Sequence, residues 1–436
     1  MSNLIIRRTA VILFLVFMNM FTGDIHAQET WKAWKYRMPI KLTHRKTDTA
    51  DIIPVDVTFS LFADRCAHPE QEIRLILKRG KTEKEVPFQL SRLSRWTKNT
   101  DGERSKPTLN GMITFFDEAT SDTDAEYVLL YGNSAAKEPI YSSDLNVTGS
   151  GPAWTIDNSK MTVSLHTSGQ IASVTLKSSP GNPIVYTERG VVHWNPGVYT
   201  PTVYWAHAWD WNPPETCEIE QGPIFVEIRR SGVFPKIPDV HLSVTYRIFA
   251  ERSYVESGTV LRVNEDIGVV ALRNDELVFD KGLFDHVAWD KDGTTMIRRL
   301  DDYEPVNHHG DILRLSDTAP FVTLFNPAKD IGAATVRDDL TAIGPNGDPP
   351  VLFDNATYIT NGQLQYWFRG LVYFHVGWTR QQLITVPKGS VYSERNLYLF
   401  YRPGSDAPVE EVAGLAKAVG AKPGIQIGEF RLPPEE

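Results

Sequence analysis

The densest chemical signal in the sequence is a run of aromatic and polar residues near the middle of the chain. Four of the eleven tryptophans fall at positions 194–211, interleaved with histidine, asparagine and aspartate. Cores seldom use tryptophan so densely, because each buried indole N–H needs a partner. Proline and asparagine favour a loop over a sheet, where binding residues often lie. We expect a sugar-binding loop, with an aromatic mini-core as the alternative; the residues concerned are His193, Trp194, Tyr204, Trp205, His207, Trp209, Asp210 and Trp211.

A second polar run, residues 272–276, stands between apolar strand segments. In a strand, alternate residues face the same side of the sheet. Arg273 and Asp275 are therefore expected on one face, and Asn274 and Glu276 on the other. On the concave side of a large sheet, the first two would present a charged pair to a ligand. The alternative is a satisfied ion pair at the end of a strand.

These residue types fit the chemistry of a lyase that acts on a uronide. Such an enzyme needs a cation or amide that neutralises the carboxylate, a base for the proton α to it, and an acid for the leaving oxygen. Arg273 is the preferred cation. His207 is the candidate base or acid, because an imidazole transfers protons near neutral pH. The other candidates are Arg247 and Asn274 for the carboxylate, and His193 and Tyr204 as the counterpart of His207.

Other sugar-related functions fit the same residues. An epimerase-type reaction needs one acid and one base, and His207 with Asp210 or Glu276 suffices. A hydrolase needs two carboxylates about 5 to 10 Å apart, for which Asp210, Glu215 and Asp275 are available. A glycan-binding protein without catalysis would use the same face. The sequence leaves these alternatives open.

We expect no metal ion and no cofactor. Of the adjacent His308 and His309, at most one can join a given site, because neighbouring residues of a strand point to opposite faces. The turn at residues 290–293 lacks the later bidentate acid of a calcium loop. Cys66 and Cys217 are too few for a four-ligand zinc site, and we favour two buried thiols over a disulfide.

The first 27 residues have the three parts of a secretory signal peptide. Arg7 and Arg8 form a positive start, residues 9–21 are almost wholly apolar and too short to span a bilayer, and Ala27 is the best cleavage point. No cysteine near this point can be acylated. We expect an exported protein, periplasmic or secreted, that is not a lipoprotein and has no membrane span after signal removal.

The net charge bears on the partners of the protein. The chain is mildly acidic, with a formal net charge of −9. Such a chain repels nucleic acid and anionic membrane, so neither is an expected partner. The expected partner is a polysaccharide or oligosaccharide substrate. A polyanionic one requires a local basic pocket against this background.

Strands must position these residues. Runs such as residues 55–59 and 242–246 cluster or alternate β-branched and aromatic side chains, and Gly, Pro, Asn and Asp break them at short spacing. One convincing helix is predicted, at residues 408–419, where apolar residues form one face before Gly420. The predicted fold is all-β, with a signal peptide at 1–27, a small β-sandwich at 28–147, a large sandwich at 150–405, and a helix and tail at 406–436.

The first domain resembles the small β-sandwich modules that precede catalytic domains in exported carbohydrate enzymes. Residues 34–37 (WKYR) and 131–133 (YGN) carry this resemblance. It implies a structural or orienting role. Trp96 and Arg95 could meet a sugar, but an isolated aromatic residue in a strand-rich domain is more often part of the core.

The second domain resembles the galactose-mutarotase-like supersandwich over roughly residues 150–400. The segments that carry the resemblance are 154–158 (WTIDN), 168–171 (SGQI), 221–223 (QGP), 246–247 (YR) and 254–256 (YVE). The nearest resemblance is to exported rhamnogalacturonan-lyase-like polysaccharide lyases, in which a small β domain precedes the supersandwich. It implies carbohydrate binding on a concave face. We favour a polysaccharide lyase acting on a uronic-acid-containing glycan, with a non-catalytic glycan-binding protein or an epimerase- or mutarotase-type enzyme as alternatives.

Overall fold

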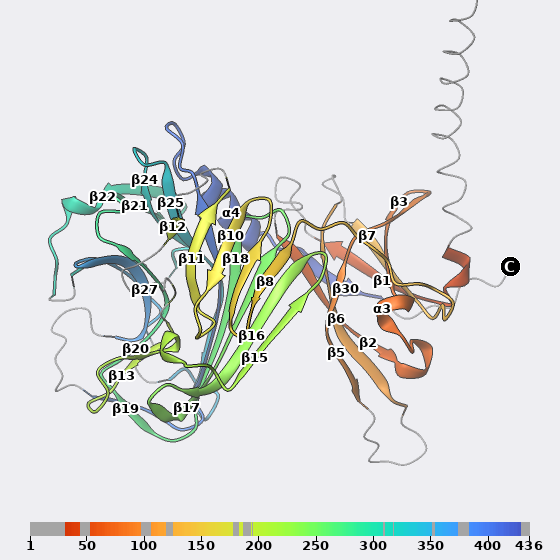
Figure 1. Ribbon diagram of the computed structural model, residues 1–436, viewed down its shortest axis with the longest axis horizontal. Helices are drawn as coiled ribbons and strands as arrows, with labels where there is room; N and C mark the ends of the chain where they lie inside the picture. Colours follow the sequence, from red (N-terminus) through yellow and green to blue (C-terminus); the bar gives the residue numbers. More distant parts are fainter. Residues whose placement is uncertain are drawn as a thin grey trace, which may run out of the picture. The chain divides into compact units, whose positions relative to one another are not determined.

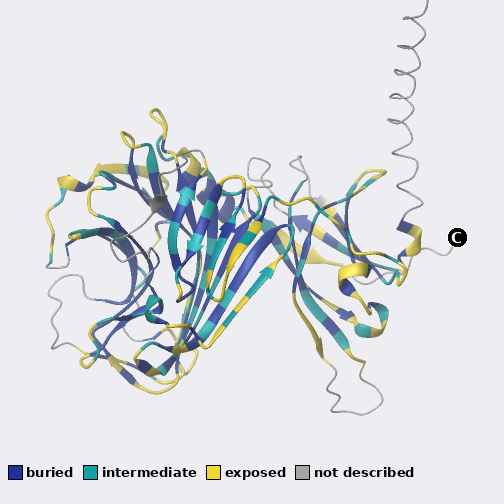
Figure 2. Cartoon of the chain, in the orientation of Figure 1, coloured by how far each residue is buried: buried dark blue, intermediate teal, exposed yellow. Residues whose placement is uncertain are grey.

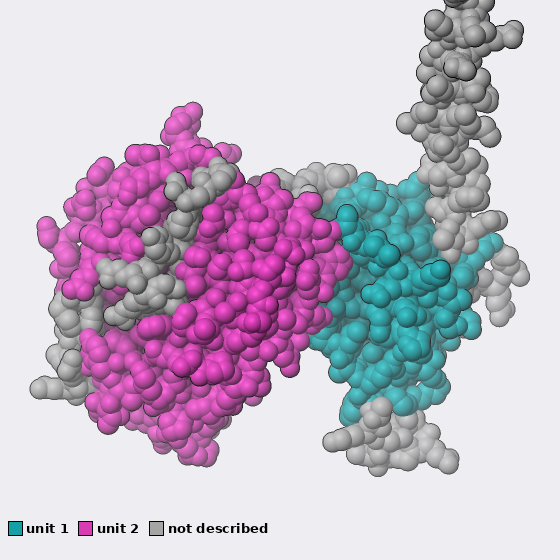
Figure 3. All heavy atoms as spheres, in the orientation of Figure 1, with its two compact units in different colours: residues 1–142, 421–436 teal, residues 143–420 magenta. Residues whose placement is uncertain are grey.

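The computed structural model describes most of the chain. The described residues are 31–43, 53–96, 106–118, 125–177, 183–185, 193, 195–307, 310–316, 318–350, 354–373 and 383–428. The predicted signal peptide, Trp194, His308 and His309 lie outside them. The chain divides into two compact units: unit 1 is residues 1–142 with 421–436, and unit 2 is residues 143–420 (Figure 3). Strands dominate both units, so the all-β prediction is confirmed (Figure 1).

Unit 1 is a β-sandwich of two sheets. One sheet has the strand order β30-β1-β7-β3-β4 and the other β2-β6-β5. The bounds are β1 (Tyr36–Thr43), β2 (Pro54–Phe62), β3 (Arg74–Arg79), β4 (Thr82–Glu85), β5 (Gln89–Trp96), β6 (Thr108–Phe116), β7 (Ala125–Tyr131) and β30 (Gly424–Ile427). Burial alternates along β2 (Figure 2): Val57 and Phe59 enter the core, and Thr58 between them is exposed. The period-2 pattern read from residues 55–59 is therefore a half-buried strand.

The last strand of unit 1 comes from the C-terminal part of the chain. Strand β30 pairs antiparallel with β1, with Ile427 opposite Ile40 and Gly424 opposite Thr43. The sequence predicts only a helix and a tail at 406–436, so β30 is a strand that the sequence-based prediction does not contain. Its burial pattern is exposed throughout, and a four-residue edge strand carries too little hydrophobic periodicity to be recognised alone.

Unit 2 contains a nine-stranded and a six-stranded sheet, with smaller sheets of five and two strands. The nine strands are β15 (Thr216–Gln221), β16 (Phe225–Phe234), β17 (Ile237–Phe249), β18 (Tyr254–Val263), β29 (Val391–Tyr401), β25 (Ile331–Ile343), β24 (Phe321–Asn326), β21 (His286–Lys291) and β22 (Thr294–Arg299). The six are β14 (Ala206–His207), β13 (Gly197–Tyr199), β20 (Ala271–Asp280), β27 (Leu364–Val372), β26 (Thr357–Asn361) and β23 (Asp311–Arg314).

The smaller elements complete unit 2. The five-stranded sheet is β12 (Pro183–Val185), β11 (Ile171–Leu176), β10 (Met161–Leu165), β9 (Ala153–Asp157) and β8 (Asn146–Ser150), and β19 (Ile267–Val269) pairs with β28 (Ile384–Val386). The predicted helix is present as α4 (Glu410–Gly420). It buries Val412 and Leu415 and contacts β24 and β25.

The six-stranded sheet has two different faces. One face shares a continuous apolar core with the nine-stranded sheet; this face includes Leu272, Leu277, Ile359 and Trp367. The opposite face carries a separate, aromatic cluster that includes Tyr199, Tyr358, Phe368 and Tyr373, with Trp205 and Tyr366 packed against it. We call the aromatic side the Arg273 face, because Arg273 lies at its centre.

Candidate functional site

Strand register brings His207 and Arg273 to the same face of the six-stranded sheet. Gly197 is the direct partner of His207 on one side and of Arg273 on the other, and Arg273 is in turn paired with Gly370. Side chains of directly opposed residues project to the same face. Because glycine has no side chain, the Asn195 amide and the His207 imidazole can approach Gly197 closely, and the side chains of Tyr358 and Tyr373 cover Gly370.

Trp205 lies between these two groups. Its ring stacks on the His207 imidazole with centroids 5.5 Å apart and 17° between the planes. The Cζ of Arg273 lies 4.4 Å from the centre of the Trp205 ring, 3.8 Å from that of Phe368 and 4.6 Å from that of Tyr373. Three aromatic faces therefore surround one guanidinium, an arrangement that holds a cation in place through the ring quadrupoles.

The guanidinium of Arg273 is almost fully buried, with 4% of the residue exposed. Its Nε and Nη2 atoms have no hydrogen-bond partner. These two donors form one edge of the guanidinium plane, the edge that grips a carboxylate through two parallel hydrogen bonds. A buried polar group without a partner needs an explanation, and a ligand carboxylate would satisfy both donors.

The expectation that Arg273 and Asp275 share a face is wrong. Between Asn274 and Leu277 the strand register shifts by one residue, and Asp275 has a φ of 49°. This β-bulge resets the alternation. The Arg273 Nη1 consequently lies 3.9 Å from Glu276 Oε1. Asn274 turns inward, where its Nδ2 donates to Thr259 Oγ1 and Glu394 Oε2, both at 2.6 Å.

Asp275 also lies in the interior between the sheets. Its carboxylate accepts from Thr335 Oγ1 at 3.0 and 3.1 Å and lies 3.5 Å from Arg369 Nη2. Burial and the neighbouring Glu394 raise the pKa of Asp275. The predicted substrate-binding roles of Asn274 and Asp275 are therefore not supported by their positions; both hold the bulge that aims Arg273 and Glu276.

Glu276 is the ionisable group best suited to proton transfer on this face. The residue is 2% exposed and its Oε2 has no partner. Burial raises its pKa to about 7, against the lowering effects of Arg273 and of the Asn195 amide. A carboxyl group with a pKa near neutrality can both take and return a proton.

Asp311 adds a second carboxylate to the site. It accepts hydrogen bonds from Thr360 Oγ1 at 2.7 Å and from Tyr373 OH at 2.6 Å. Burial alone would lower the pKa of Arg273. The groups around the guanidinium outweigh burial and raise this pKa; they are Tyr373, Tyr366, Glu276 and Asp311. In the sequence, Asp311 is distinguished only by its closeness to His308 and His309. The register of Asp311 opposite Thr360 is what brings it to the Arg273 face.

The remaining residues of the tryptophan run have mixed positions. Tyr204 is 62% exposed and packs edge-on against Tyr199, at 5.0 Å between centroids. Trp209 is half-buried. Asp210 accepts from the His207 backbone N–H at 3.1 Å and so fixes the loop. Trp211 is a core residue, 5% exposed, whose Nε1 donates to the Val233 carbonyl at 2.9 Å.

Two further predicted binding residues, in addition to Asn274, Asp275 and Trp211, are not on the Arg273 face. His193 is completely buried between the sheets, where Nδ1 hydrogen-bonds Tyr246 OH and Nε2 lies 3.3 Å from Tyr398 OH. Burial lowers its pKa to about 3, so it is a neutral structural histidine. Arg247 forms a two-pronged pair with Glu256 on the nine-stranded sheet, at 2.8 and 2.9 Å. Its charge is already matched there.

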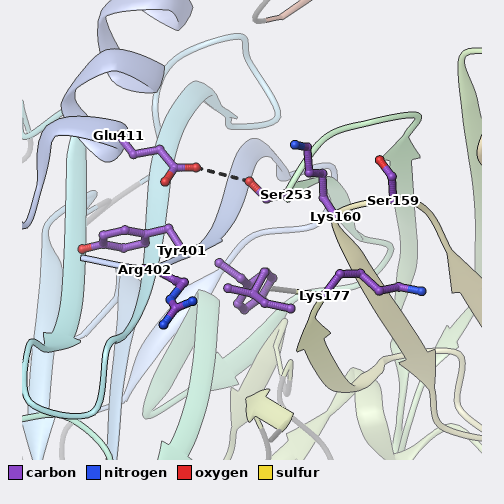
Figure 4. A pocket seen from close by; sticks show the side chains of 9 residues that line it. Ser159, Lys160, Lys177, Ser253, Tyr401, Arg402 and Glu411 are labelled. Carbon is purple, nitrogen blue, oxygen red and sulfur yellow. Dashed lines mark hydrogen bonds between the residues drawn. The ribbon is translucent and has the colours of Figure 1, made fainter. Parts of the chain in front are cut away.

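A pocket of about 520 Å³ lies elsewhere in unit 2, near the start of α4 (Figure 4). The predicted site residues do not line it. Its acid, Glu411, accepts from Ser253 Oγ at 3.3 Å. Two of its cations, Lys177 and Arg402, are paired with Asp157 and Asp330. The charges at this pocket are largely matched, so it is a weaker candidate than the Arg273 face.

The described residues contain no group of three or more His, Cys, Asp or Glu side chains placed to hold a metal ion. Within the same part of the chain, no helix has the length and apolar character needed to cross a bilayer.

Comparison with known proteins shows the fold. No protein-family model matches the chain, and no curated protein matches it significantly. A solved protein of glycosyl hydrolase family 38 from Enterococcus faecalis aligns with 90% of this chain, at 11% identity and a TM-score of 0.50. An alpha-mannosidase from Enterococcus faecalis V583 aligns with 91%, at 10% identity and a TM-score of 0.52.

The extent of these matches limits what they imply. The chain spans about half the length of the two structures, 47% and 46%. A galactose mutarotase-like protein from Lactobacillus casei aligns along its whole length with 59% of this chain, at 13% identity and a TM-score of 0.36. At these identities the first two likenesses concern the fold alone, and the third is too weak to carry an argument. The chemistry must therefore be inferred from the residues of the site.

Proposed function

We propose that the protein is a carbohydrate-active enzyme that binds a uronic-acid-containing glycan on the Arg273 face and cleaves it as a polysaccharide lyase. The observation that carries this proposal is the buried guanidinium of Arg273. Its Nε and Nη2 have no partner, and its Nη1 lies 3.9 Å from Oε1 of Glu276, a carboxyl group whose pKa is about 7. The protein acts outside the cytoplasm, on the strength of the signal-like residues 1–27.

The first step is neutralisation of the substrate carboxylate. When a uronate carboxylate binds to Nε–H and Nη2–H of Arg273, its negative charge is partly neutralised. It can then accept more of the negative charge that develops at the α-carbon in the transition state. This makes the α-proton more acidic. Trp205, Phe368 and Tyr373 fix the guanidinium, so little reorganisation accompanies the reaction.

The second step is elimination. Glu276 lies beside Arg273 and takes the proton from the carbon that bears the carboxylate. The electrons of that C–H bond form a double bond to the adjacent ring carbon, and the bond from that carbon to the glycosidic oxygen breaks. His207, on the far side of Gly197, donates a proton to the leaving oxygen. The products are an unsaturated uronide and a new chain end, without net uptake of water.

A second function uses the same acid and base. His207 lies across Gly197 from Arg273, and Glu276 lies 3.9 Å from Arg273; an epimerase-type enzyme needs only an acid and a base such as these two residues. That reaction leaves no double bond in its product. It has no use for a buried guanidinium edge that matches a carboxylate, which is why the lyase is preferred.

The test is an absorbance screen with the full-length exported protein. Polygalacturonate, alginate and hyaluronan are offered in turn, and an unsaturated product is detected in the near ultraviolet. Arg273→Gln should lower the rate at least a hundredfold, because two charge-assisted hydrogen bonds contribute about 3 kcal/mol to stabilisation of the transition state. The control is Arg262→Gln, an exposed arginine on β18, which should keep the wild-type rate. Sugar isomerisation without an absorbing product would favour the epimerase, and full activity of Arg273→Gln would exclude the proposed site.

A further inference from the structure

The three-stranded sheet of unit 1 carries an exposed aromatic row. Trp96 of β5 and Phe62 of β2 are both paired with Thr108 of β6. Directly paired residues project to one face, so the two rings share a side of the sheet. They stand two strand spacings apart, about 9.6 Å. We call this side the Trp96 face.

The exposure of these rings is unusual for their residue types. Trp96 is 65% exposed and Phe62 is 43% exposed. The sequence favours a core position for Trp96, and the structure shows the opposite. Residues Arg92 to Trp96 are all exposed along the free edge of the sheet (Figure 2). A tryptophan held open on a strand adds little to the core of its domain, and it is a side chain suited to binding partners with one apolar face.

Polar groups form the neighbouring row on the same face. Ser94 and Ser60 are both paired with Asn110, and Ser60 Oγ donates to Asn110 Oδ1 at 2.7 Å. This row lies two residues along the strands from the aromatic row, about 7 Å away. A sugar ring stacked on the indole of Trp96 would therefore bring its hydroxyl groups towards Ser94 and Asn110. The combination of a flat apolar platform and nearby hydroxyl and amide groups suits carbohydrate.

Cationic groups lie beside the aromatic row. Lys106 Nζ is 5.8 Å from the centre of the Phe62 ring, and Arg65 Cζ is 4.8 Å from it. Lys106 is 3.6 Å from Asp64, but both side chains are about 60% exposed, and such surface pairs contribute little. A carboxylate on a ligand can therefore compete for Lys106. This favours an acidic glycan over a neutral one.

The surface is also hollowed at the strand that carries Trp96, although Trp96 itself does not line the hollow. A pocket of about 260 Å³ lies along the free edge of β5, lined by residues that include Leu93, Ser94 and Leu109. Ser94 thus belongs both to the polar row and to the wall of this pocket.

We propose that the Trp96 face is a second, non-catalytic binding surface for a carboxylated glycan chain. Trp96 stacks on a sugar ring, Ser94 and Asn110 contact its hydroxyl groups, and Lys106 attracts a carboxylate. The choice of an acidic glycan rests on the proposed function of the Arg273 face. The role of the surface is to hold polymer, so it affects long substrates and not short ones.

The experiment is affinity electrophoresis of the full-length protein in gels that contain polygalacturonate, alginate or neutral galactan. Trp96→Ala should weaken retardation by an acidic polymer at least tenfold, and Lys106→Ala should weaken it for the acidic polymers only. The control is Ile140→Ala, a 96% exposed apolar residue of the same unit, which should migrate as wild type. The melting temperature of Trp96→Ala should match that of wild type, since the side chain is mostly exposed.

Further outcomes separate this surface from the Arg273 face. Trp96→Ala should keep wild-type turnover of a short oligosaccharide, whereas Arg273→Gln should lose that turnover and keep the part of the retardation that depends on Trp96. Wild-type retardation of Trp96→Ala, or no retardation of wild type by any of the three polymers, would overturn the surface. Retardation lost in Arg273→Gln but kept in Trp96→Ala would place all binding at the Arg273 face, overturning the surface while leaving the lyase proposal intact.

Discussion

His207 and Arg273 face the same side of one sheet because both are paired with Gly197. The two residues are 66 positions apart in the chain, yet the register fixes them two strands apart, about 9.6 Å between backbones. Trp205 lies between them, and the absence of a side chain on Gly197 lets the Asn195 amide and the His207 ring pack closely over its backbone. An acid–base group and a carboxylate-binding group thus border one position on the sheet.

Filling this position should remove activity. A Cβ on Gly197 would lie 2.4 Å from Asn195 Oδ1 and 2.7 Å from His207 Cδ2, so the imidazole or the amide must move. Gly197→Ala should therefore lower turnover at least tenfold. Gly268→Ala is the matched control, because a Cβ there meets nothing within 4 Å; it should retain the wild-type rate. Equal rates for both variants would show that the space beside Gly197 is not used.

The raised pKa of Glu276 predicts a pH-dependent difference in stability. Its pKa is about 7 in the folded protein against an ordinary value of 4.5. Between these pH values the unfolded chain loses the proton first, so the folded state becomes relatively less stable as pH rises. Glu276→Gln lacks this titrating group, so its folding stability does not fall for this reason as the pH rises. Its stability relative to wild type should increase by up to about 3 kcal/mol from pH 4.5 to 8, as measured by urea unfolding; a difference independent of pH would contradict this.

The carboxylate of Asp275 should stabilise the bulge. Asp275→Ala leaves Thr335 and Arg369 without this acceptor in the interior, and should cost about 3 kcal/mol of unfolding free energy. Asp292→Ala is the control, because Asp292 has a similar φ of 53° but is exposed. Asp292→Ala also places an alanine at a left-handed φ, which costs about 1 kcal/mol of unfolding free energy, as in Asp275→Ala. If urea unfolding gave equal losses for the two variants, the buried contacts of Asp275 would contribute nothing.

The two histidines of the tryptophan run should behave differently. His193→Ala leaves the hydroxyls of Tyr246 and Tyr398 without this partner, at a cost of about 3 kcal/mol. Its pH–rate profile should be that of wild type, because the neutral His193 takes no part in proton transfer. His207→Ala should abolish turnover while the melting temperature changes by only a few degrees. The opposite pattern would assign His193 to catalysis and His207 to structure.

Much of the architecture can be predicted from hydrophobic periodicity. The strand patterns predict two sandwiches, and the apolar face at residues 408–419 predicts α4. The tryptophan run directs attention to Trp205 and His207, which do lie with Arg273. Strand β30 escapes prediction because its partner β1 is nearly 400 positions away in the chain.

The site itself is only partly predictable, because register and bulges are tertiary properties. Strict alternation places Arg273 with Asp275, and one extra residue at the bulge replaces Asp275 by Glu276. The bulge places Asp275 at a left-handed φ. Aspartate is one of the residue types that tolerate this conformation, and this is only a weak local indication of a bulge. Composition cannot separate His207 from His193, since strand pairing sends one to the Arg273 face and the other into the core.

The central claim is that Arg273 recognises the carboxylate of a uronic-acid glycan. The most direct test is a comparison of turnover on an acidic polymer and on the same polymer after chemical reduction of its carboxyl groups to alcohols. The wild-type protein should release an unsaturated product from the acidic polymer and lose at least a hundredfold of its rate on the reduced one, and Arg273→Gln should be equally slow on both. Equal wild-type rates on the acidic and the reduced polymer would contradict the account.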